Sequence, residues 1–324
     1  MKLFLLGIDT SAYTASVGVV DREGKVIADR RRPLPVPQGE KGLRQQTAVF
    51  HHVQFLPQLL TEVFREVPPK GIAAVGASTR PRPVEGSYMP VFTVSQGMGL
   101  VLASALEVPF FPTSHQEGHL EAGLWSAGWD PRGAPFIAVH LSGGTSEILK
   151  VEEKKEGFVI TKLGGTLDLH AGQLVDRIGV LLGLPFPAGP HLERLAQGVR
   201  EKAVSLTSAV RGLNFSFSGP ASQAERLYRQ GVPPEQIARA VEQCIANTLE
   251  RVLRRAISLT GIRDVLLVGG VAANCYIRER LRQRLEHRAV GARLHFASPL
   301  YSSDNAVGVA LMAKRKFFSA GIQG

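Results

Sequence analysis

The chain has 324 residues, of which 44% are hydrophobic and 20% are charged, as is typical of a globular protein with a large buried core. The length allows about two domains, and no apolar run reaches the roughly 18 to 20 residues of a membrane helix, which argues against a membrane protein. The net charge of +10 favours a polyanionic partner, most commonly nucleic acid, over a basic protein that binds none. Basic residues cluster at Arg30–Arg32, Arg80, Arg82, 278–288 and Lys314–Lys316.

The N-terminal apolar run lacks the charged region and the long apolar stretch of a signal peptide, so it predicts a first β-strand. The two cysteines are Cys244, in an apolar helical pattern, and Cys275, after a glycine-rich turn. So few cysteines in a chain of this size are typical of reduced thiols and not of a disulfide framework. We therefore expect a cytoplasmic protein.

One pattern occurs twice along the chain. Residues 4–21 and residues 136–153 each read as an apolar strand, a turn of small polar residues and a second apolar strand. Each stretch predicts a β-hairpin. Two copies of one supersecondary unit, each opening its own half of the chain, predict a duplicated fold with two lobes.

Helices are expected between the two hairpins. Residues 47–67 have apolar residues at helical spacing, with Pro57 as a kink point. Residues 95–108 predict a helix of small residues that is suited to close packing. Proline and arginine residues in 77–90 predict a loop.

Residues 115–119, with the sequence HQEGH, are the first to suggest chemistry. On a helix, His115 and His119 are about 40° apart in rotation, so both lie on one face and can share a metal ion. Glu117 is about 200° from His115, and it does not directly follow the first histidine as the base of a zinc protease does. The alternative without a metal is a solvated helix face. Asp304, where a strand meets a helix, is a candidate third ligand or the cap of that helix.

The second half contains a strand, a turn and a helix that suit phosphate binding. Residues 264–268 predict a buried strand, Gly269 and Gly270 the turn, and a helix begins near Asn274. Backbone N–H groups at such a turn point outward, and glycine permits close approach of a ligand. A long amphipathic helix precedes this strand at residues 233–261, with proline at its start and glycine at its end. A final helix is expected at residues 305–321, returning to the first lobe.

The order of these elements resembles the actin, sugar kinase and heat-shock ATPase superfold, an α/β fold of two lobes with a nucleotide in the cleft between them. We expect an N-terminal lobe formed by residues 1–110 and 297–324. Residues 111–296 are expected to form the C-terminal lobe.

The whole set of motifs resembles one family, the tRNA threonylcarbamoyladenosine synthases, or TsaD-like proteins, once described as O-sialoglycoprotein endopeptidases. The resemblance covers almost the entire chain and implies an acyltransferase that moves a threonylcarbamoyl group from threonylcarbamoyl-adenylate to N6 of an adenosine beside the tRNA anticodon. The matching stretches, in order, are GIDTS, HQEGH, LSGGTSEI, TLDLHAGQLVDRIGVLLGLPFPAGP, NFSFSG, LVGGVAAN and SSDNA.

The resemblance also implies site residues. The metal ligands fall on His115, His119 and Asp304, and the metal is expected to be iron or zinc acting as a Lewis acid or an orienting group. An adenine nucleotide or acyl-adenylate is the expected ligand of a second set of residues. That set is His140, Leu141, Ser142, Gly143, Gly144, Asp176, Gly189 and Asn274. No catalytic residue is assigned.

The chain departs from the family pattern where acidic residues are usual. Ala12, Tyr13 and Thr14 replace Cys-Asp-Glu, and residues 168–173 read DLHAGQ in place of Asp-Asp-Ala-Ala-Gly-Glu. Thr145 stands where histidine is usual, and the loop at residues 77–90 is longer and more basic. Because carboxylates are candidate bases for the attacking amine, these losses keep other functions open.

Two functions compete with transfer to tRNA. One is a divergent paralogue that binds metal and nucleotide but acts as a partner without catalysis. The other is a carbamoyltransferase with another acceptor, and a protease is the weakest interpretation. The expected partners are tRNA and the adenylate, with no membrane. The family resemblance adds a paralogous protein, or a second copy, bound through the N-terminal lobe.

Overall fold

The computed structural model describes residues 3–37, 42–199 and 204–321, and these divide into two compact units. Unit 1 comprises Met1–Asp130, Glu153–Val159 and Ser303–Gly324, and unit 2 comprises Pro131–Glu152 and Ile160–Ser302. The outermost residues of the predicted N-terminal lobe lie outside the described residues. The division differs from the predicted lobes because residues 111–130 and 153–159 group with unit 1 and residues 297–302 with unit 2.

Unit 1 is built on a sheet with the strand order β3-β2-β1-β4-β5. Its strands are β1 (Phe4–Thr10), β2 (Thr14–Asp21), β3 (Val26–Pro33), β4 (Ile72–Arg80) and β5 (Phe110–Ser114). The predicted first hairpin is confirmed, since β1 pairs antiparallel with β2 from Phe4↔Asp21 to Thr10↔Ala15. Strands β1, β4 and β5 run parallel, so their carboxyl ends meet at one edge of the sheet.

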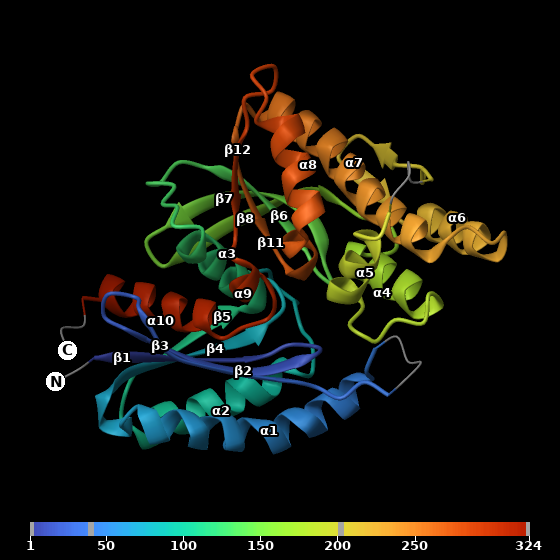
Figure 1. Ribbon diagram of the computed structural model, residues 1–324. Coiled ribbons are helices and arrows are strands. Elements are labelled where there is room, and N and C mark those ends of the chain that lie inside the picture. The colour runs from blue at the N-terminus through green and yellow to red at the C-terminus, as the bar shows by residue number, and fades with distance from the viewer. Residues whose placement is uncertain (1–2, 38–41, 200–203, 322–324) are drawn as a thin grey trace. The chain divides into compact units, whose positions relative to one another are not determined.

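Helices cover both faces of this sheet (Figure 1). They are α1 (Gln45–Glu66), α2 (Phe92–Ala105), α3 (His115–Ser126) and α10 (Val307–Ser319), with a short turn η1 (Pro69–Gly71) before β4. Helices α1 and α2 pack on one face, and α10 packs on the other, as predicted for the C-terminal helix. A Cβ atom at Gly7 or Gly18 would overlap the backbone near Ala306, so these glycines let α10 lie directly on the sheet.

Helix α3 groups with unit 1 because it packs against α10. A Cβ at Gly308 would overlap the carbonyl of Gly118, which shows how closely the two helix backbones approach. The packing depends on two glycines far apart in the sequence. The boundary predicted at residue 110 therefore falls before a helix that belongs to the first unit.

The sheet of the second half has the strand order β12-β11-β6-β7-β8. Its strands are β6 (Phe136–Leu141), β7 (Ser146–Lys154), β8 (Gly157–Gly165), β11 (Asp264–Val268) and β12 (Arg293–Phe296), and a separate small pair is β9 (Ala209–Arg211) with β10 (Asn214–Ser216). The predicted second hairpin is confirmed by antiparallel pairing of β6 with β7. Strand β11 runs parallel to β6, which brings the predicted strand–turn–helix beside the hairpin turn.

Helices of unit 2 pack on this sheet around one apolar core. They are α4 (Ala171–Leu181), α5 (Gly189–Ala196), α6 (Ser218–Arg229), α7 (Pro234–Thr260), α8 (Cys275–Leu285) and α9 (Pro299–Ser302), with a short turn η2 (Gly270–Ala273). Alternate residues of β6, such as Ile137 and Val139, share this core with α4 and α7, as expected for one face of a sheet. The predicted long helix is confirmed and ends at Gly261, whose φ of 72° suits glycine.

Part of the predicted loop at 77–90 is a strand. Residues up to Arg80 belong to β4, because Ala77, Ser78 and Arg80 pair with β5, and the loop itself covers residues 81–91.

Both cysteines are free, Cys244 buried and Cys275 exposed. Among the described residues, no helix combines the length and the hydropathy needed to cross a membrane.

Candidate metal centre and adenylate turns

Helix α3 begins with a capping box that fixes the direction of its first turn. The Ser114 hydroxyl accepts a hydrogen bond from the Glu117 N–H (3.2 Å), and a Glu117 carboxylate oxygen accepts one from the Ser114 N–H (2.8 Å). Glu117 is thus engaged at the helix start, as expected for a capping box. The carboxylate that gives HQEGH its likeness to a protease motif is therefore a structural cap.

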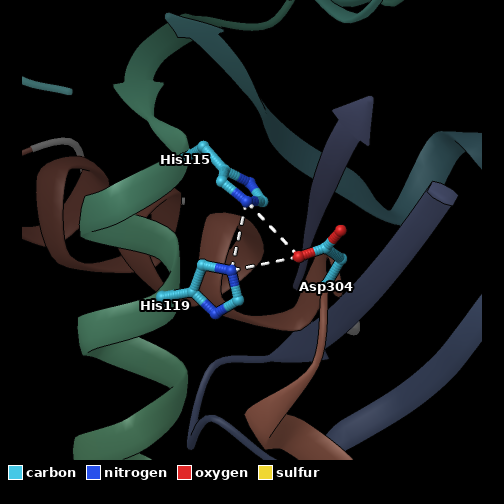
Figure 2. Close-up of side chains that lie close together, drawn as sticks. All are labelled: His115, His119 and Asp304. Atoms are coloured by element: carbon cyan, nitrogen blue, oxygen red, sulfur yellow. Dashed lines mark hydrogen bonds and ion pairs between the residues drawn. The ribbon is translucent and has the colours of Figure 1, made fainter. Parts of the chain in front are cut away.

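The three predicted metal ligands lie together in unit 1 (Figure 2). His115 and His119 point from successive turns of α3 toward Asp304, which precedes α10. The two Nε2 atoms are 3.1 Å apart, and Asp304 Oδ1 lies 3.4 Å from His115 Nε2 and 3.2 Å from His119 Nε2. Three donor atoms therefore converge on one point, the arrangement that a metal ion needs.

Two residues of the GIDTS segment orient these ligands. His115 Nδ1–H donates a hydrogen bond to Asp9 Oδ1 (2.9 Å). The lone pair of Nε2 in the same ring is then directed at the place where a metal ion would bind. The Ser11 hydroxyl donates to Asp304 Oδ2, so the other carboxylate oxygen faces the histidines. His52 of α1 in turn donates from Nε2 to the Ser11 carbonyl (2.7 Å) and holds this turn. Sequence reasoning assigned no role to these three residues.

The charges of the group suit a cation. Burial would lower the pKa of His115, but the carboxylates of Asp9 and Asp304 raise it well above its usual value. Burial would likewise raise the pKa of Asp304, but hydrogen bonds from His115 and His119 hold it well below its usual value. Two imidazole nitrogens and one carboxylate oxygen are a donor set that binds zinc or iron(II). The residues present therefore fit the predicted metal.

Asp9 should control the metal affinity without touching the metal. Asp9→Asn is expected to lower the affinity by about 10- to 100-fold, because the amide no longer holds His115 as strongly in the correct tautomer. Competition with a chromogenic chelator measures the affinity. Asp21→Asn, at the other end of the same hairpin, is the matched control. Equal affinities for the wild type and Asp9→Asn would contradict this role.

The predicted adenylate residues begin at the turn between β6 and β7 in unit 2. A hydrogen bond from the Ser142 N–H to the Thr145 carbonyl (2.8 Å) closes the turn. The turn also contacts the start of α4. The Gly172 N–H donates to the Ser142 carbonyl (3.2 Å), and a Cβ at Gly172 would lie 2.7 Å from Gly143 N and Cα. Space around Gly144 is open. The turn is therefore packed against the start of α4 on one side and is open around Gly144 on the other.

The remaining predicted residues lie on neighbouring turns of the same unit. Gly269, with φ of 96°, lies directly against the Leu141 carbonyl, and Asp176 Oδ1 accepts from the Ala188 N–H (2.8 Å), just before Gly189. Helices α5 and α8 are joined where Glu193 Oε1 accepts from the Cys275 N–H (2.7 Å). The hairpin turn, α4, α5, α8 and the Gly269 turn thus form a closed series of contacts. The structure brings the predicted set together.

Three of these residues have structural roles as well. Asn274 Oδ1 accepts from the Ile277 N–H (2.9 Å) as the N-cap of α8, and its Nδ2 donates to Glu242 Oε1 (2.6 Å). Leu141 is fully buried and His140 is 2% exposed. Leu141 thus belongs to the core, and its backbone lies against Gly269.

Comparisons with known proteins show the family of this chain. The family model described as tRNA N6-adenosine threonylcarbamoyltransferase matches residues 37–311. A relative of that name from Archaeoglobus fulgidus is 34% identical over 308 residues, covering 95% of this chain and 90% of the relative. Another from Thermus thermophilus is 33% identical and covers 97% and 93%. The chain belongs to the tRNA N6-adenosine threonylcarbamoyltransferase family.

Comparison with solved structures shows that this chain has the actin-like ATPase fold, as predicted. T. kodakarensis HypF has a TM-score of 0.62 at 14% identity, covering 99% of this chain and 50% of HypF. Component A of the Acidaminococcus fermentans (R)-2-hydroxyglutaryl-CoA dehydratase has a TM-score of 0.58 at 16% identity and covers 98% and 99%. A ROK family glucokinase from Streptomyces griseus has a TM-score of 0.54 at 14% identity, covering 96% and 99%.

The positions where the chain departs from the family pattern have structural roles. The turn at Ser11–Thr14 carries no carboxylate, and the Ser11 N–H donates to the Thr14 carbonyl (3.1 Å). The remaining acid of the second motif, Asp168, accepts from the N–H groups of Leu169 (2.6 Å) and Phe217 (3.0 Å). Leu169 and Gln173 replace the other two acids, and Gln173 Oε1 accepts from the N–H of His170 (3.0 Å), the N-cap residue of α4. These residues maintain turns and supply no free carboxylate.

Glu242, which sequence reasoning missed, gives unit 2 a pH-dependent stability. Its carboxylate is 1% exposed and is held by Asn274 and by Arg239 NH1 (2.7 Å). Burial raises the pKa of Glu242 to about 7, although Asn274 and Arg239 oppose this. The folded protein therefore binds more protons than the unfolded chain between pH 4.5 and about 7. The free energy of unfolding should fall as pH rises through this window and level off above it.

We expect this loss to reach up to about 3 kcal/mol and to be absent in Glu242→Gln. Urea unfolding at a series of pH values measures it. Glu279→Gln, at an exposed glutamate of α8, is the control and should keep the wild-type profile. Parallel profiles for the wild type and Glu242→Gln would show that Glu242 is not the group responsible.

Proposed function

We propose that this chain transfers a threonylcarbamoyl group from threonylcarbamoyl-adenylate to N6 of an adenosine in tRNA. The observation that carries the proposal is the preserved trio of His115, His119 and Asp304, oriented by Asp9 and Ser11, in a chain of this family. Family membership supports the acceptor. The net charge of +10 supports binding of a polyanion.

Unit 1 holds the metal in this proposal. His115, His119 and Asp304 would bind iron or zinc, which as a Lewis acid polarises a carbonyl oxygen or orients the threonyl part of the donor. Asp9 keeps His115 in the required tautomer, and Ser11 keeps one oxygen of Asp304 directed at the histidines. The role of this chain's own residues is to present three fixed donors on rigid elements.

Unit 2 binds the adenylate in this proposal. The backbone N–H groups of Gly143 and Gly144 would bind the phosphate, with the Gly144 N–H giving up its bond to the Ser142 hydroxyl (3.3 Å). Asp176 would accept from the ribose, and Gly189 leaves room for the nucleoside because its surroundings are open. His140 and Leu141 position the turn from within β6. Asn274 has one amide hydrogen left beyond its bond to Glu242.

The reaction is an acyl transfer that balances without a further reactant. N6 of the adenosine forms a bond to the carbamoyl carbon, the bond from that carbon to the adenylate oxygen breaks, and AMP leaves. N6 loses one proton. The turn at Ala12–Thr14 offers no carboxylate to receive it, and this observation favours the second candidate, a partner that binds metal and nucleotide without catalysis.

A protein partner is part of the proposal. Leu100 (47% exposed) and Val101 (65% exposed) lie on α2, and Phe50 (58% exposed) lies on α1, so an apolar surface is open on these helices of unit 1. We assign it to a paralogous protein or to a second copy of the chain. The place of action is the cytoplasm, where tRNA is modified.

A single-turnover reaction distinguishes the candidates. Metal-loaded protein is mixed with unmodified tRNA and with threonylcarbamoyl-adenylate that is labelled in the threonyl part. The reaction is run in the presence and in the absence of a protein that binds the N-terminal lobe. Label should appear in the tRNA, and not in tRNA that has guanosine in place of the acceptor adenosine. Nucleotide and metal binding without label transfer under either condition would favour the partner without catalysis.

A further inference from the structure

The loop between β4 and α2, residues 81–91, is anchored at both ends beside the metal trio. At its start, the Pro81 carbonyl accepts from the N–H of Gln116, the residue after His115 (3.0 Å). At its end, the Val91 carbonyl accepts from the Thr10 hydroxyl (2.8 Å), and Thr10 ends the strand that carries Asp9. Both ends are thus tied to the segments that hold the trio.

Further contacts fix the loop in place. The ring of Phe92, the next residue, lies 5.5 Å from the ring of His115. Within the loop, the Arg82 N–H donates to the Ser87 hydroxyl (3.0 Å), and the Ser87 N–H donates to the Val84 carbonyl (3.2 Å). These hydrogen bonds close a compact turn. The outer side chains of the loop therefore extend from a compact turn whose two ends are anchored beside the trio.

The outer side chains are an aromatic ring and a cation. Tyr88 is 69% exposed, the largest exposed fraction among the aromatic residues of this loop and of the helices beside it. Arg80, at the end of β4, is exposed, and no described carboxylate pairs with its guanidinium. Lys316 of α10 lies close enough that Arg80 helps to lower its pKa, although burial contributes more. Arg80 pairs with Ser114, and Lys316 donates to the Pro112 carbonyl, so two cations lie near the start of α3.

We propose that Tyr88 stacks on a tRNA base next to the acceptor adenosine and that Arg80 binds a backbone phosphate. The choice of tRNA rests on the proposed function, while the chemistry of the loop indicates a single strand. An exposed aromatic ring can stack on the face of any base, and an unpaired guanidinium can donate hydrogen bonds to a phosphate. Bases of an anticodon loop are unstacked enough to be read in this way. The loop that carries the ring is anchored at both ends beside the trio, within reach of the neighbour of a reacting adenosine.

Binding of an anticodon stem-loop tests the two residues separately. The RNA carries 2-aminopurine beside the acceptor adenosine, and Kd and fluorescence are measured over a series of salt concentrations. Tyr88→Ala should raise Kd by about 5- to 100-fold and abolish the stacking-dependent fluorescence change, with the salt slope unaltered. Tyr88→Phe should bind within about twofold of the wild type. Val84→Ala, in the same loop and also exposed, is the matched control and should bind like the wild type.

Arg80→Ala should instead reduce the slope of log K against log salt by about 0.7 to 0.9, the value for one phosphate contact. Thermal unfolding confirms that each exposed substitution leaves the fold intact. Wild-type Kd and fluorescence in Tyr88→Ala, or no binding of the stem-loop by the wild type, would overturn the proposal.

The same variants keep the inference distinct from the proposed function. If the wild type transfers the group and Tyr88→Ala has an unchanged KM for tRNA, the inference fails while the function stands. If binding depends on Tyr88 but no transfer occurs, the function fails and the binding surface stands. We expect a raised KM for tRNA in Tyr88→Ala at nearly unchanged kcat, because stacking positions the RNA and does not touch the reacting atoms.

Discussion

His119→Ala is expected to abolish metal binding and to lower the transfer rate by at least about 10³-fold. A Lewis acid contributes several kcal/mol to a transition state, and each 1.4 kcal/mol is a factor of ten in rate. His119 is 4% exposed and lies about equally close to His115 Nε2 and Asp304 Oδ1, so its removal takes away one of three converging donor atoms. Elemental analysis by mass spectrometry gives the metal content, and a single-turnover reaction gives the rate.

The histidine series has an internal control. His115→Ala and Asp304→Ala should behave like His119→Ala, whereas His287→Ala, at an exposed histidine of unit 2, should keep full metal content. Thermal unfolding separates loss of metal from loss of fold. Unchanged metal content in a folded His119→Ala protein would refute the assignment of the trio.

Gly172→Ala should weaken binding of an adenine nucleotide by about 10- to 100-fold. Its Cβ would lie 2.7 Å from Gly143 N, Gly143 Cα and Ser142 O, which are backbone atoms that cannot rotate away. The hairpin turn or the start of α4 must therefore move, at a cost of about 1–3 kcal/mol in stability. Calorimetric titration with AMP and with ATP measures the affinity, and urea unfolding measures the stability.

Gly219→Ala supplies the comparison for this substitution. Gly219 lies in the first turn of α6, where an added Cβ meets nothing within 4 Å, so the variant should bind nucleotide normally. Wild-type affinity and stability in Gly172→Ala would mean that the turn at Ser142–Gly144 is not held in the way described here.

Local patterns in the sequence predicted most of the fold. Both hairpins, the strand at Asp264–Val268 and the helix at Pro234–Thr260 have their signals within a few neighbouring residues: alternation, glycine turns, proline at a helix start and glycine at its end. The relation of His115 to His119 was predictable for the same reason, because helix geometry alone places residues four apart on one face. Asp304 was a candidate third ligand or a helix cap from its position alone, and only the family resemblance assigned it to the metal, since it is 185 residues from His119.

The site residues that could not be predicted from the sequence make contacts with residues far away along the chain. Asp9 and His115 are 106 residues apart, and Ser11 and Asp304 are 293 apart, and no periodicity links such pairs. Glu242 lies in the apolar pattern of α7, where its burial beside Asn274 has no local sign. These residues become visible only when the chain is folded.

The misplaced start of the loop and the grouping of α3 with unit 1 have similar causes. Thr79 and Arg80 are polar and precede proline, which favours a loop, yet pairing with β5 extends the strand to Arg80. The boundary at residue 110 missed that α3 packs on α10 at Gly118 and Gly308, since close approach of two backbones leaves no apolar pattern. In both cases tertiary pairing outweighs local preference.

Formation of threonylcarbamoyladenosine by the metal-loaded, metal-stripped and reloaded protein tests the account most directly. Unmodified tRNA is incubated with threonylcarbamoyl-adenylate and each form of the protein, then digested to nucleosides for mass spectrometry. The account predicts that the modified nucleoside forms with the loaded protein, is lost on stripping, and returns on reloading with iron or zinc. Absence of the nucleoside with a fully loaded protein and its partner, or its formation at full rate after stripping, would contradict the account.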